Sequence, residues 1–382
     1  MKYYPITKLQ AKTPEIEEIL NLLQPLSTSS AEFDNMKVTL ILFMKSLRSD
    51  LGVEVEERYV DKVYRDSYYS YYDTKRLPYN RYCVRLSFFD SAFNKDVDLD
   101  DAENIRNNYL GFVVLRPLRY CIGRNVIDPK AKADTSLQKA KICRAAIESS
   151  CFGIKLNAVG FPHSSQDTET MTCAQTTIWA LLEYYGNKYN IYRPTTPSEI
   201  KRILESFSYE RQLPSSGLTY NQISVALRSL GFGSKVYTKG TNVERFNRLL
   251  ACYVESGIPI VLALKGAGIG HAVLTSGRTL REHIAKLHSI SNNARIALLQ
   301  IDLPKFVWVT ELSTIDEFEK DMVNSLLLID ATGNSQVNVL GNIIFLISNR
   351  YFYTYDSQNH RMIGNQVEAI PQNFEAFPGN LK

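Results

Sequence analysis

The sequence predicts an α+β protein with two domains, an N-terminal α+β domain at residues 1–150 and a second domain at residues 151–382. The length is the first indication, since 382 residues correspond to two or three domains of roughly 150 residues each. The composition is the second: 45% apolar and 22% charged residues are typical of a globular protein and exclude general disorder. The third is the order of patterns after residue 151, where helical periods come first and strand-like runs follow.

The N-terminal domain is predicted to begin with helices and to continue with strands. Residues 1–50 have helical patterns, with an amphipathic helix at Glu15–Leu23 and a more apolar one at Met36–Leu47. Strand-like apolar runs follow at Val53–Val60, Tyr82–Phe89 and Tyr109–Leu115. The polar stretch 124–145 is interpreted as a connecting loop that leads to a helix near Leu137–Ile147.

In the second domain the predicted helices precede the predicted strands. After a short strand at Phe152–Leu156, apolar residues at helical spacing define one buried face of a helix from Cys173 to near Gly186. Capping signals at Thr196-Pro-Ser-Glu199 and at Thr219 with Gln222 open two more helices. The remaining predicted elements are a helix at 242–256 and strands at Pro259–Leu264, His271–Thr275, Ser325–Ile329 and Ile343–Ile347.

Charge and cysteine usage exclude several classes of partner and compartment. With 44 Lys and Arg against 40 Asp and Glu, the net charge of +4 is too small to predict a polyanion-binding surface, so nucleic acid is not an expected partner. No apolar stretch approaches the roughly 20 residues that cross a bilayer, and the first residues lack the apolar core of a secretory signal. The six cysteines are scattered, which favours reduced thiols in a cytoplasm.

Three residues form a pattern that can do nucleophilic chemistry: Cys173, His271 and Asp330. Cys173 lies at the predicted first turn of a helix, where unpaired N–H groups and the helix dipole favour a thiolate. His271 opens a strand after a glycine-rich turn and can pair with a thiolate and protonate a leaving group. Asp330 ends the strand LLLID and can accept from the second imidazole nitrogen. The other five cysteines are interpreted as structural.

The order of a cysteine on a helix, then a histidine and an aspartate on successive strands, resembles the papain-like superfamily of cysteine peptidases. Within it the chain is most similar to the bacterial bacteriocin-processing, double-glycine type and its peptidase-like relatives. The resemblance covers about residues 165–350. The residues that carry it are Gln166-Asp167, Cys173–Gly186, Gly217-Leu-Thr to Leu230-Gly-Phe, Gly257-Ile-Pro-Ile-Val, Gly270-His271-Ala-Val and Ile329-Asp330.

The resemblance implies a papain-like domain at 151–382, in which a helical part carries the cysteine and an antiparallel sheet carries the histidine and the aspartate. It implies Cys173 as nucleophile, His271 as base, Asp330 as the residue that orients the base, and Gln166 as the donor to the oxyanion. It implies no cofactor and no metal.

The chain departs from the family pattern in three places. Gln166 lies one residue further upstream of the cysteine than is usual in the family, and Ala174 stands where these peptidases commonly have glycine. Residues 279–322, with two histidines, lengthen the connection between the histidine and the aspartate. We interpret them as an insertion that folds beside or over the site. Asp302 is the alternative to Asp330 as the orienting residue, and the turn that follows Asp330 favours Asp330.

The function predicted from these residues is that of a cytoplasmic cysteine hydrolase, a peptidase that cleaves a protein or peptide. One alternative is acyl transfer, because transglutaminases and arylamine acyltransferases use the same triad to pass the acyl group to an amine. Another is a catalytically inactive papain-like binding or sensing module. In each case residues 1–150 are available to contact a protein partner.

The segment Tyr64–Arg85 combines many tyrosines with arginine and lysine. Aromatic rings interleaved with cations can stack on bases or contact a protein partner. Amphipathic packing at sheet edges and loops explains the same pattern without a ligand, and we favour that interpretation from the sequence.

Overall fold

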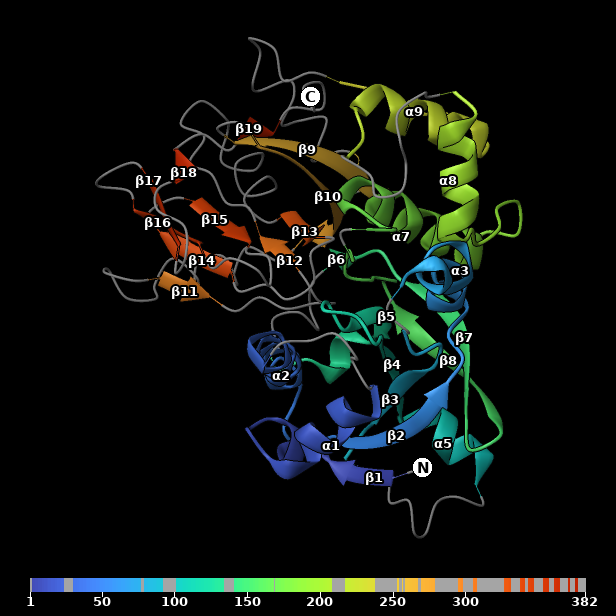
Figure 1. Cartoon of the computed structure of the whole chain (residues 1–382), viewed down its shortest axis with the longest axis vertical. Coiled ribbons are helices and arrows are strands. Elements are labelled where there is room, and N and C mark those ends of the chain that lie inside the picture. Colours follow the sequence, from blue (N-terminus) through green and yellow to red (C-terminus); the bar gives the residue numbers. More distant parts are fainter. Residues whose placement is uncertain are drawn as a thin grey trace.

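The computed structural model describes residues 2–23, 30–76, 79–91, 101–133, 141–167, 169–207 and 217–237, and beyond these a series of strands with a few neighbouring residues between 253 and 376. It contains helices and antiparallel sheets, which confirms the α+β class. Figure 1 shows the N-terminal sheet towards one end of the long axis and the helices that follow residue 173 towards the other end.

Five antiparallel strands form the N-terminal sheet, in the order β1 (Lys2–Pro5), β2 (Gly52–Tyr59), β3 (Cys83–Phe89), β4 (Tyr109–Leu115) and β5 (Ile122–Ile127). Every residue of β3, β4 and β5 is buried, so both faces of the sheet are covered. Val113 packs with α1 (Pro14–Leu23) and α2 (Ser30–Lys45) on one face. Its neighbour Phe112 belongs to the core on the opposite face, since successive residues of a strand alternate between faces.

Short helices lie between the strands of this sheet and directly after its last strand. They are η1 (Ile6–Leu9), α3 (Lys62–Ser70), η2 (Tyr72–Thr74), α5 (Ala102–Asn108) and η3 (Pro129–Ala131). Aspartates cap three of them: Asp61 accepts from the N–H groups of Val63 and Tyr64 at 3.0 and 2.9 Å, Asp101 caps α5 in the same way, and Asp128 caps η3. The predicted strands of this domain are confirmed within about one residue.

The prediction of a connecting loop at 124–145 is wrong over the part that the structure describes. Arg124 lies in β5 and Lys132 follows η3, and both are buried. The predicted helix near Leu137–Ile147 is also wrong from Ala145 onward, where β7 (Ala145–Cys151) pairs with β8 (Ile154–Gly160). Burial in β7 alternates with period two, which suits a strand with one covered face.

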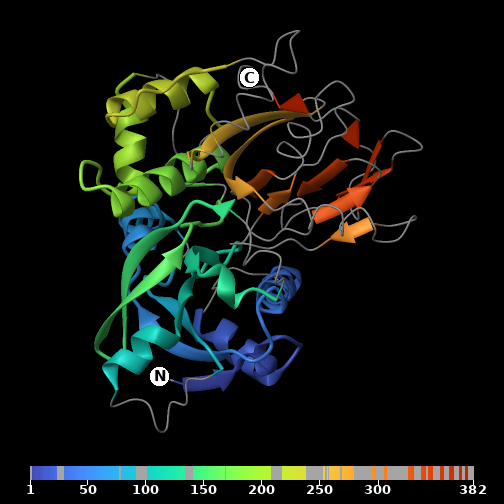
Figure 2. The same cartoon turned by 180° about the vertical axis from the view of Figure 1, so that it is seen from behind.

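The β7–β8 hairpin lies between the N-terminal sheet and the helices that follow (Figure 1, Figure 2). Its turn consists of Phe152 and Gly153, with φ of 52° and 76°. Two central residues with positive φ match the twist of the flanking strands. The sequence position of about 150, predicted as the domain boundary, falls at this turn, and one hydrophobic cluster extends on both sides of it.

Three helices form the next layer: α7 (Cys173–Lys188), α8 (Pro197–Glu205) and α9 (Tyr220–Ser229). The capping box predicted for α9 is confirmed, because Thr219 and Gln222 each bond the other's backbone. At the start of α8, Pro197 follows Thr196 as predicted, but Glu199 pairs with Arg193. Asp66 of α3 instead accepts from the N–H of Ser198 at 2.7 Å.

A second antiparallel sheet follows the helices. Its strands, in spatial order, are β12 (Lys305–Val307), β13 (Leu326–Asp330), β10 (Ile269–Arg278), β9 (Ile260–Gly266) and β19 (Glu375–Ala376), and β6 (Lys141–Ile142) also pairs with β10. The predicted strands at 259–264, 271–275 and 325–329 are thereby confirmed. Part of the predicted insertion at 279–322 belongs to this sheet, because β12 lies inside it; the alternative residue Asp302 lies outside the described residues.

The remaining strands form two small sheets. One consists of β11 (Arg295–Ala297), β14 (Val337–Leu340) and β15 (Ile343–Leu346), and the other of β16 (Tyr353–Asp356), β17 (Arg361–Gly364) and β18 (Ile370–Pro371). The predicted helix at 242–256 lies almost wholly outside the described residues.

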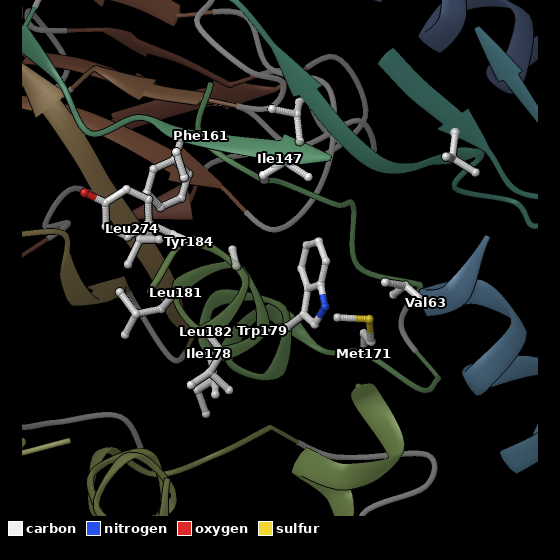
Figure 3. Packing of buried hydrophobic residues seen from close by; sticks show 14 of the residues in the cluster. Val63, Ile147, Phe161, Met171, Ile178, Trp179, Leu181, Leu182, Tyr184 and Leu274 are labelled. Atoms are coloured by element: carbon white, nitrogen blue, oxygen red, sulfur yellow. The ribbon is translucent and has the colours of Figure 1, made fainter. Parts of the chain in front are cut away.

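Helix α7 is central to the larger hydrophobic core. Ile178 and Trp179 are fully buried, and Leu274 of β10 belongs to the same cluster. Figure 3 shows Trp179 on the side of α7 near Met171 and Val63, with Leu181 and Tyr184 towards Leu274 and Phe161. The helix is therefore packed between the N-terminal half and the second sheet.

Candidate functional site

Cys173 is the first residue of α7 and is half-buried. Thr172 precedes it as the N-cap residue, and the Gln175 Oε1 atom accepts from the Thr172 N–H at 3.0 Å and from its hydroxyl at 3.3 Å. This capping arrangement fixes the start of the helix at Cys173. The thiol therefore lies at the positive end of the helix dipole, where a negative charge is stabilised.

A threonine one turn into α7 connects the cysteine to the strand that carries the histidine. The Thr177 hydroxyl donates to the carbonyl oxygen of Cys173 at 2.8 Å and lies 3.4 Å from the carbonyl oxygen of Ala272. Ala272 is fully buried and directly follows His271. The start of α7 is thus held against β10 at the position of the predicted base.

The backbone register of β10 and β13 brings the other two predicted residues close together. Val273 is paired with Asp330. His271 lies two positions before Val273, and positions two apart on a strand share a face. Residues 271 and 330 are therefore diagonal neighbours on one face of the sheet, a relation that places Cβ atoms about 7–8 Å apart or slightly closer. For both residues the structure describes the backbone.

The loop before Cys173 is organised by a buried carboxylate. Asp167 accepts hydrogen bonds from the N–H groups of Glu169, Thr170 and Met171 at 2.9, 2.7 and 2.8 Å. Its own N–H donates to the Met171 carbonyl at 3.1 Å, which closes the loop. The half-buried Gln166 directly precedes this loop. Asp167 therefore fixes the path of the chain between Gln166 and Cys173.

Side chains of the N-terminal half hold the same loop from outside. The buried Arg116 donates from Nη2 to the carbonyl of Ser165 at 2.9 Å, next to Gln166. Lys75 pairs with Glu169 at 3.0 Å. Burial, and to a smaller extent the charge of Asp167, raises the pKa of Tyr72 well above its ordinary value. Sequence reasoning assigned no such role to these residues, because the contacts join positions that are far apart in the chain.

An ionic network that is buried except for Lys62 fastens α7 itself to the N-terminal half. The Glu183 carboxylate lies 3.0 Å from Lys62 Nζ and 3.9 Å from Arg124 Nε. Arg124 also lies 4.0 Å from Asp61, the residue that caps α3. Two carboxylates and two cations leave the network neutral, which limits the cost of removing these charges from water. The network connects α7, β5 and the start of α3.

Two other kinds of feature are absent from the described residues, a metal site and a membrane-spanning helix. In the described part of the chain, no group of three or more His, Cys, Asp and Glu residues is placed to hold a metal ion. No helix of that part is both long enough and apolar enough to cross a bilayer.

Comparison of the chain with family models, with curated proteins and with solved structures found no match.

Proposed function

We propose that this chain is a papain-like cysteine hydrolase that cleaves a protein or peptide, with Cys173 as nucleophile, His271 as base and Asp330 as its orienting partner. The observation that carries the proposal is the contact of Thr177 with both Cys173 and Ala272, combined with the pairing of Val273 with Asp330. These contacts bring a thiol at a helix N-terminus next to a strand that bears an imidazole, beside a strand that ends in a carboxylate.

In the proposed mechanism, the Cys173 thiolate attacks the carbonyl carbon of the scissile amide and a C–S bond forms. The Gln166 side chain and the Cys173 N–H donate to the oxygen on which negative charge develops. The C–N bond then breaks as the His271 imidazolium gives its proton to the leaving amine. A water, deprotonated by His271, attacks the thioester, so that the acid product leaves and the thiolate is restored. Asp330 holds the imidazole through its other nitrogen.

The N-terminal half has a supporting role in this proposal. Arg116 and Lys75 hold the loop that carries Gln166, and Lys62 and Arg124 hold α7. Because geometric errors of about 1 Å can reduce catalysis by two orders of magnitude, residues that fix this loop and this helix act as positioning residues.

The test is labelling with a peptidyl vinyl sulfone, compared with a vinyl sulfone that lacks the peptide, with the modified residue located by mass spectrometry. We expect the peptidyl reagent to modify Cys173 faster than the small reagent, and His271→Ala to abolish the advantage. Cys173→Ser serves as the control for modification elsewhere. Equal rates for both reagents, or modification spread over several cysteines, contradict a peptidase.

A second measurement, with a peptide ester as substrate, distinguishes hydrolysis from acyl transfer. A peptide ester cleaved in the presence of a primary amine is expected to give the acid and not the amide. Dominant formation of the amide instead assigns the chain to acyl transfer.

A further inference from the structure

Three arginines surround a single tyrosine on the surface of the N-terminal half. The guanidinium carbon atoms of Arg58, Arg65 and Arg81 lie 4.8, 5.4 and 5.2 Å from the centre of the Tyr82 ring. Arg58 and Arg81 are exposed and Tyr82 is half-buried. The proposed hydrolase mechanism uses none of these residues.

Two of the arginines act on the hydroxyl group of the tyrosine, one of them through a direct hydrogen bond. Arg81 Nη2 donates to Tyr82 Oη at 3.3 Å, and the Arg58 guanidinium lies over the same ring. The hydrogen bond from Arg81, and after it the neighbouring Arg58, lower the pKa of Tyr82. The local potential therefore favours a negative charge at the hydroxyl oxygen.

These guanidinium groups lack the carboxylate partners that other arginines of the protein have. Arg48 and Arg85 lie 2.6 Å from Asp50 and Glu56, respectively. None of the three arginines around Tyr82 forms an ion pair with a carboxylate of the described residues. In addition, the Nε and Nη2 atoms of Arg65 are shielded from solvent and have no hydrogen-bond partner there. Guanidinium groups that lie close together without a carboxylate repel one another, and a bound anion would remove that repulsion.

The backbone also holds Arg58 at this place. The pairing of β2 with β3 shifts register between Glu56 and Tyr59, which is a bulge. Arg58 lies in the bulge with φ of +55°, a left-handed conformation that residues other than glycine seldom adopt. The bulge turns this arginine towards Tyr82.

We propose that Arg58, Arg81 and the Tyr82 hydroxyl form a binding site for a phosphoryl dianion, with Arg65 beside it as further positive charge. A phosphoryl group carries about two negative charges and three acceptor oxygens, so it can accept from both guanidinium forks and from the hydroxyl at once. A single carboxylate has one negative charge and only two oxygens. The site stands independently of the hydrolase proposal.

The experiment is isothermal titration calorimetry of the whole chain with three probes: inorganic phosphate, a short peptide with a central phosphoserine, and the same peptide with serine. Arg58→Gly and Arg81→Ala each remove one guanidinium group. Glycine is chosen at position 58 because it adopts positive φ without strain. Arg106→Ala is the matched control, since Arg106 is an exposed arginine on α5 away from any aromatic ring contact in the described structure.

We expect saturable phosphate binding that weakens about tenfold or more in Arg58→Gly and in Arg81→Ala, as loss of a charge-assisted bond predicts, and that is unchanged in Arg106→Ala. Tighter binding of the phosphopeptide than of inorganic phosphate identifies a phosphorylated side chain as the natural source. Equal binding identifies a free phosphate compound. Absence of phosphate binding, equal binding by all variants, or equal binding of the serine peptide overturns the proposal. Unfolding curves of each variant distinguish a lost site from a lost fold.

Discussion

The cysteine side chains differ sharply in their surroundings. Burial raises the pKa of Cys121 and of Cys151 to about 12, and it raises the pKa of Cys83 and Cys143 as well. Among the cysteines that the structure describes, Cys173 alone is accessible in part and lies at a helix N-terminus. Since the thiolate and not the thiol reacts with electrophiles, reactivity should follow this difference.

The first prediction is that iodoacetamide modifies Cys173 before the other five cysteines at a pH near 6. Replacement of His271 by alanine should slow this reaction roughly tenfold by removing the cation that stabilises the thiolate. Asp330→Asn should have a smaller effect in the same direction. The rates are measured by quenched time points and mass spectrometry of the peptides. Equal reactivity of Cys173 and Cys83 would remove the basis for a nucleophilic role.

The second prediction concerns alkaline pH. The Cys121 thiol ionises near pH 8.5 in the unfolded chain but near pH 12 in the folded protein. Above pH 8.5 the folded state therefore binds more protons than the unfolded state, so stability is complete below that pH and falls as the pH rises. One such thiol contributes a loss of about 1.4 kcal/mol per pH unit between pH 8.5 and 12.

Urea unfolding at pH 8 and pH 10 measures this effect. Cys121→Ala is expected to lower stability at pH 8, because it removes a buried group, but to lose less stability than the unchanged protein between the two pH values. Cys173→Ala is the control and should not reduce the loss between these pH values, because the proposed Cys173 thiolate binds no proton in the folded protein. An identical slope for the unchanged protein and Cys121→Ala would show that Cys121 does not contribute.

At the scale of elements, the important contact is that between α7 and β10. Thr177 connects them through its hydroxyl, whereas its neighbour Thr176 has a buried hydroxyl with no hydrogen-bond partner among the described residues. Both side chains are almost fully buried. The two positions therefore provide a matched pair of the same residue type on the same helix.

The third prediction uses this pair. Thr177→Val keeps the shape of the side chain and removes the hydroxyl, so it should lower stability by about 1 kcal/mol and slow the labelling of Cys173 several-fold. Thr176→Val removes a hydroxyl that lacks a partner, and it should be neutral or stabilising. Urea unfolding and the labelling rate measure the two effects. If both variants behave alike, the hydroxyl of Thr177 does not hold the helix against β10.

The elements differ in how well the sequence predicts them. The α9 capping box and the strands at 109–115 and 326–330 have local signals, because capping residues and apolar runs bounded by turns act over a few neighbours. The β7 strand lacks such a signal, since its polar residues and alanines also suit a helix, and its pairing with β8 decides the outcome. Arg124 and Lys132 suggested an exposed loop, but partners from distant parts of the chain bury them.

On the scale of the whole molecule, the N-terminal half and α7 form a continuous body. The hydrophobic cluster extends from Val63 to Leu274, and Glu183 adds an ionic connection to Lys62 and Arg124. For the site, local settings in the sequence suffice to propose Cys173, His271 and Asp330 as a triad, and these roles stay a prediction. The sequence did not predict Arg116, Glu183 or the folding of 163–171 onto the N-terminal sheet, because only tertiary contacts define those roles.

The fourth prediction is that Glu183→Gln lowers the free energy of unfolding by about 3 kcal/mol, because Arg124 keeps its buried charge and loses a counter-charge. The change should also slow the labelling of Cys173, since α7 is then less firmly held. Glu148→Gln is the matched control: Glu148 pairs with Lys155 at 3.4 Å on the exposed side of the hairpin, so a change within about 0.5 kcal/mol is expected. Similar losses of unfolding free energy in both variants would show that the Glu183 network stabilises the protein no more than an exposed ion pair does.

The second sheet has a consequence for how the protein is made. Strand β10 pairs with β6 at residues 141–142 and with β13 at 326–330, and β19 at 375–376 closes the edge beside β9. A ribosome adding 5–20 residues per second completes α7 roughly 10–40 s before it reaches β19. During that interval the nascent chain carries Cys173 at the start of α7 without the finished second sheet. If Cys173, His271 and Asp330 act as proposed, the chemistry requires both β10 and β13, so a translation product that ends before Asp330 is expected to be inert.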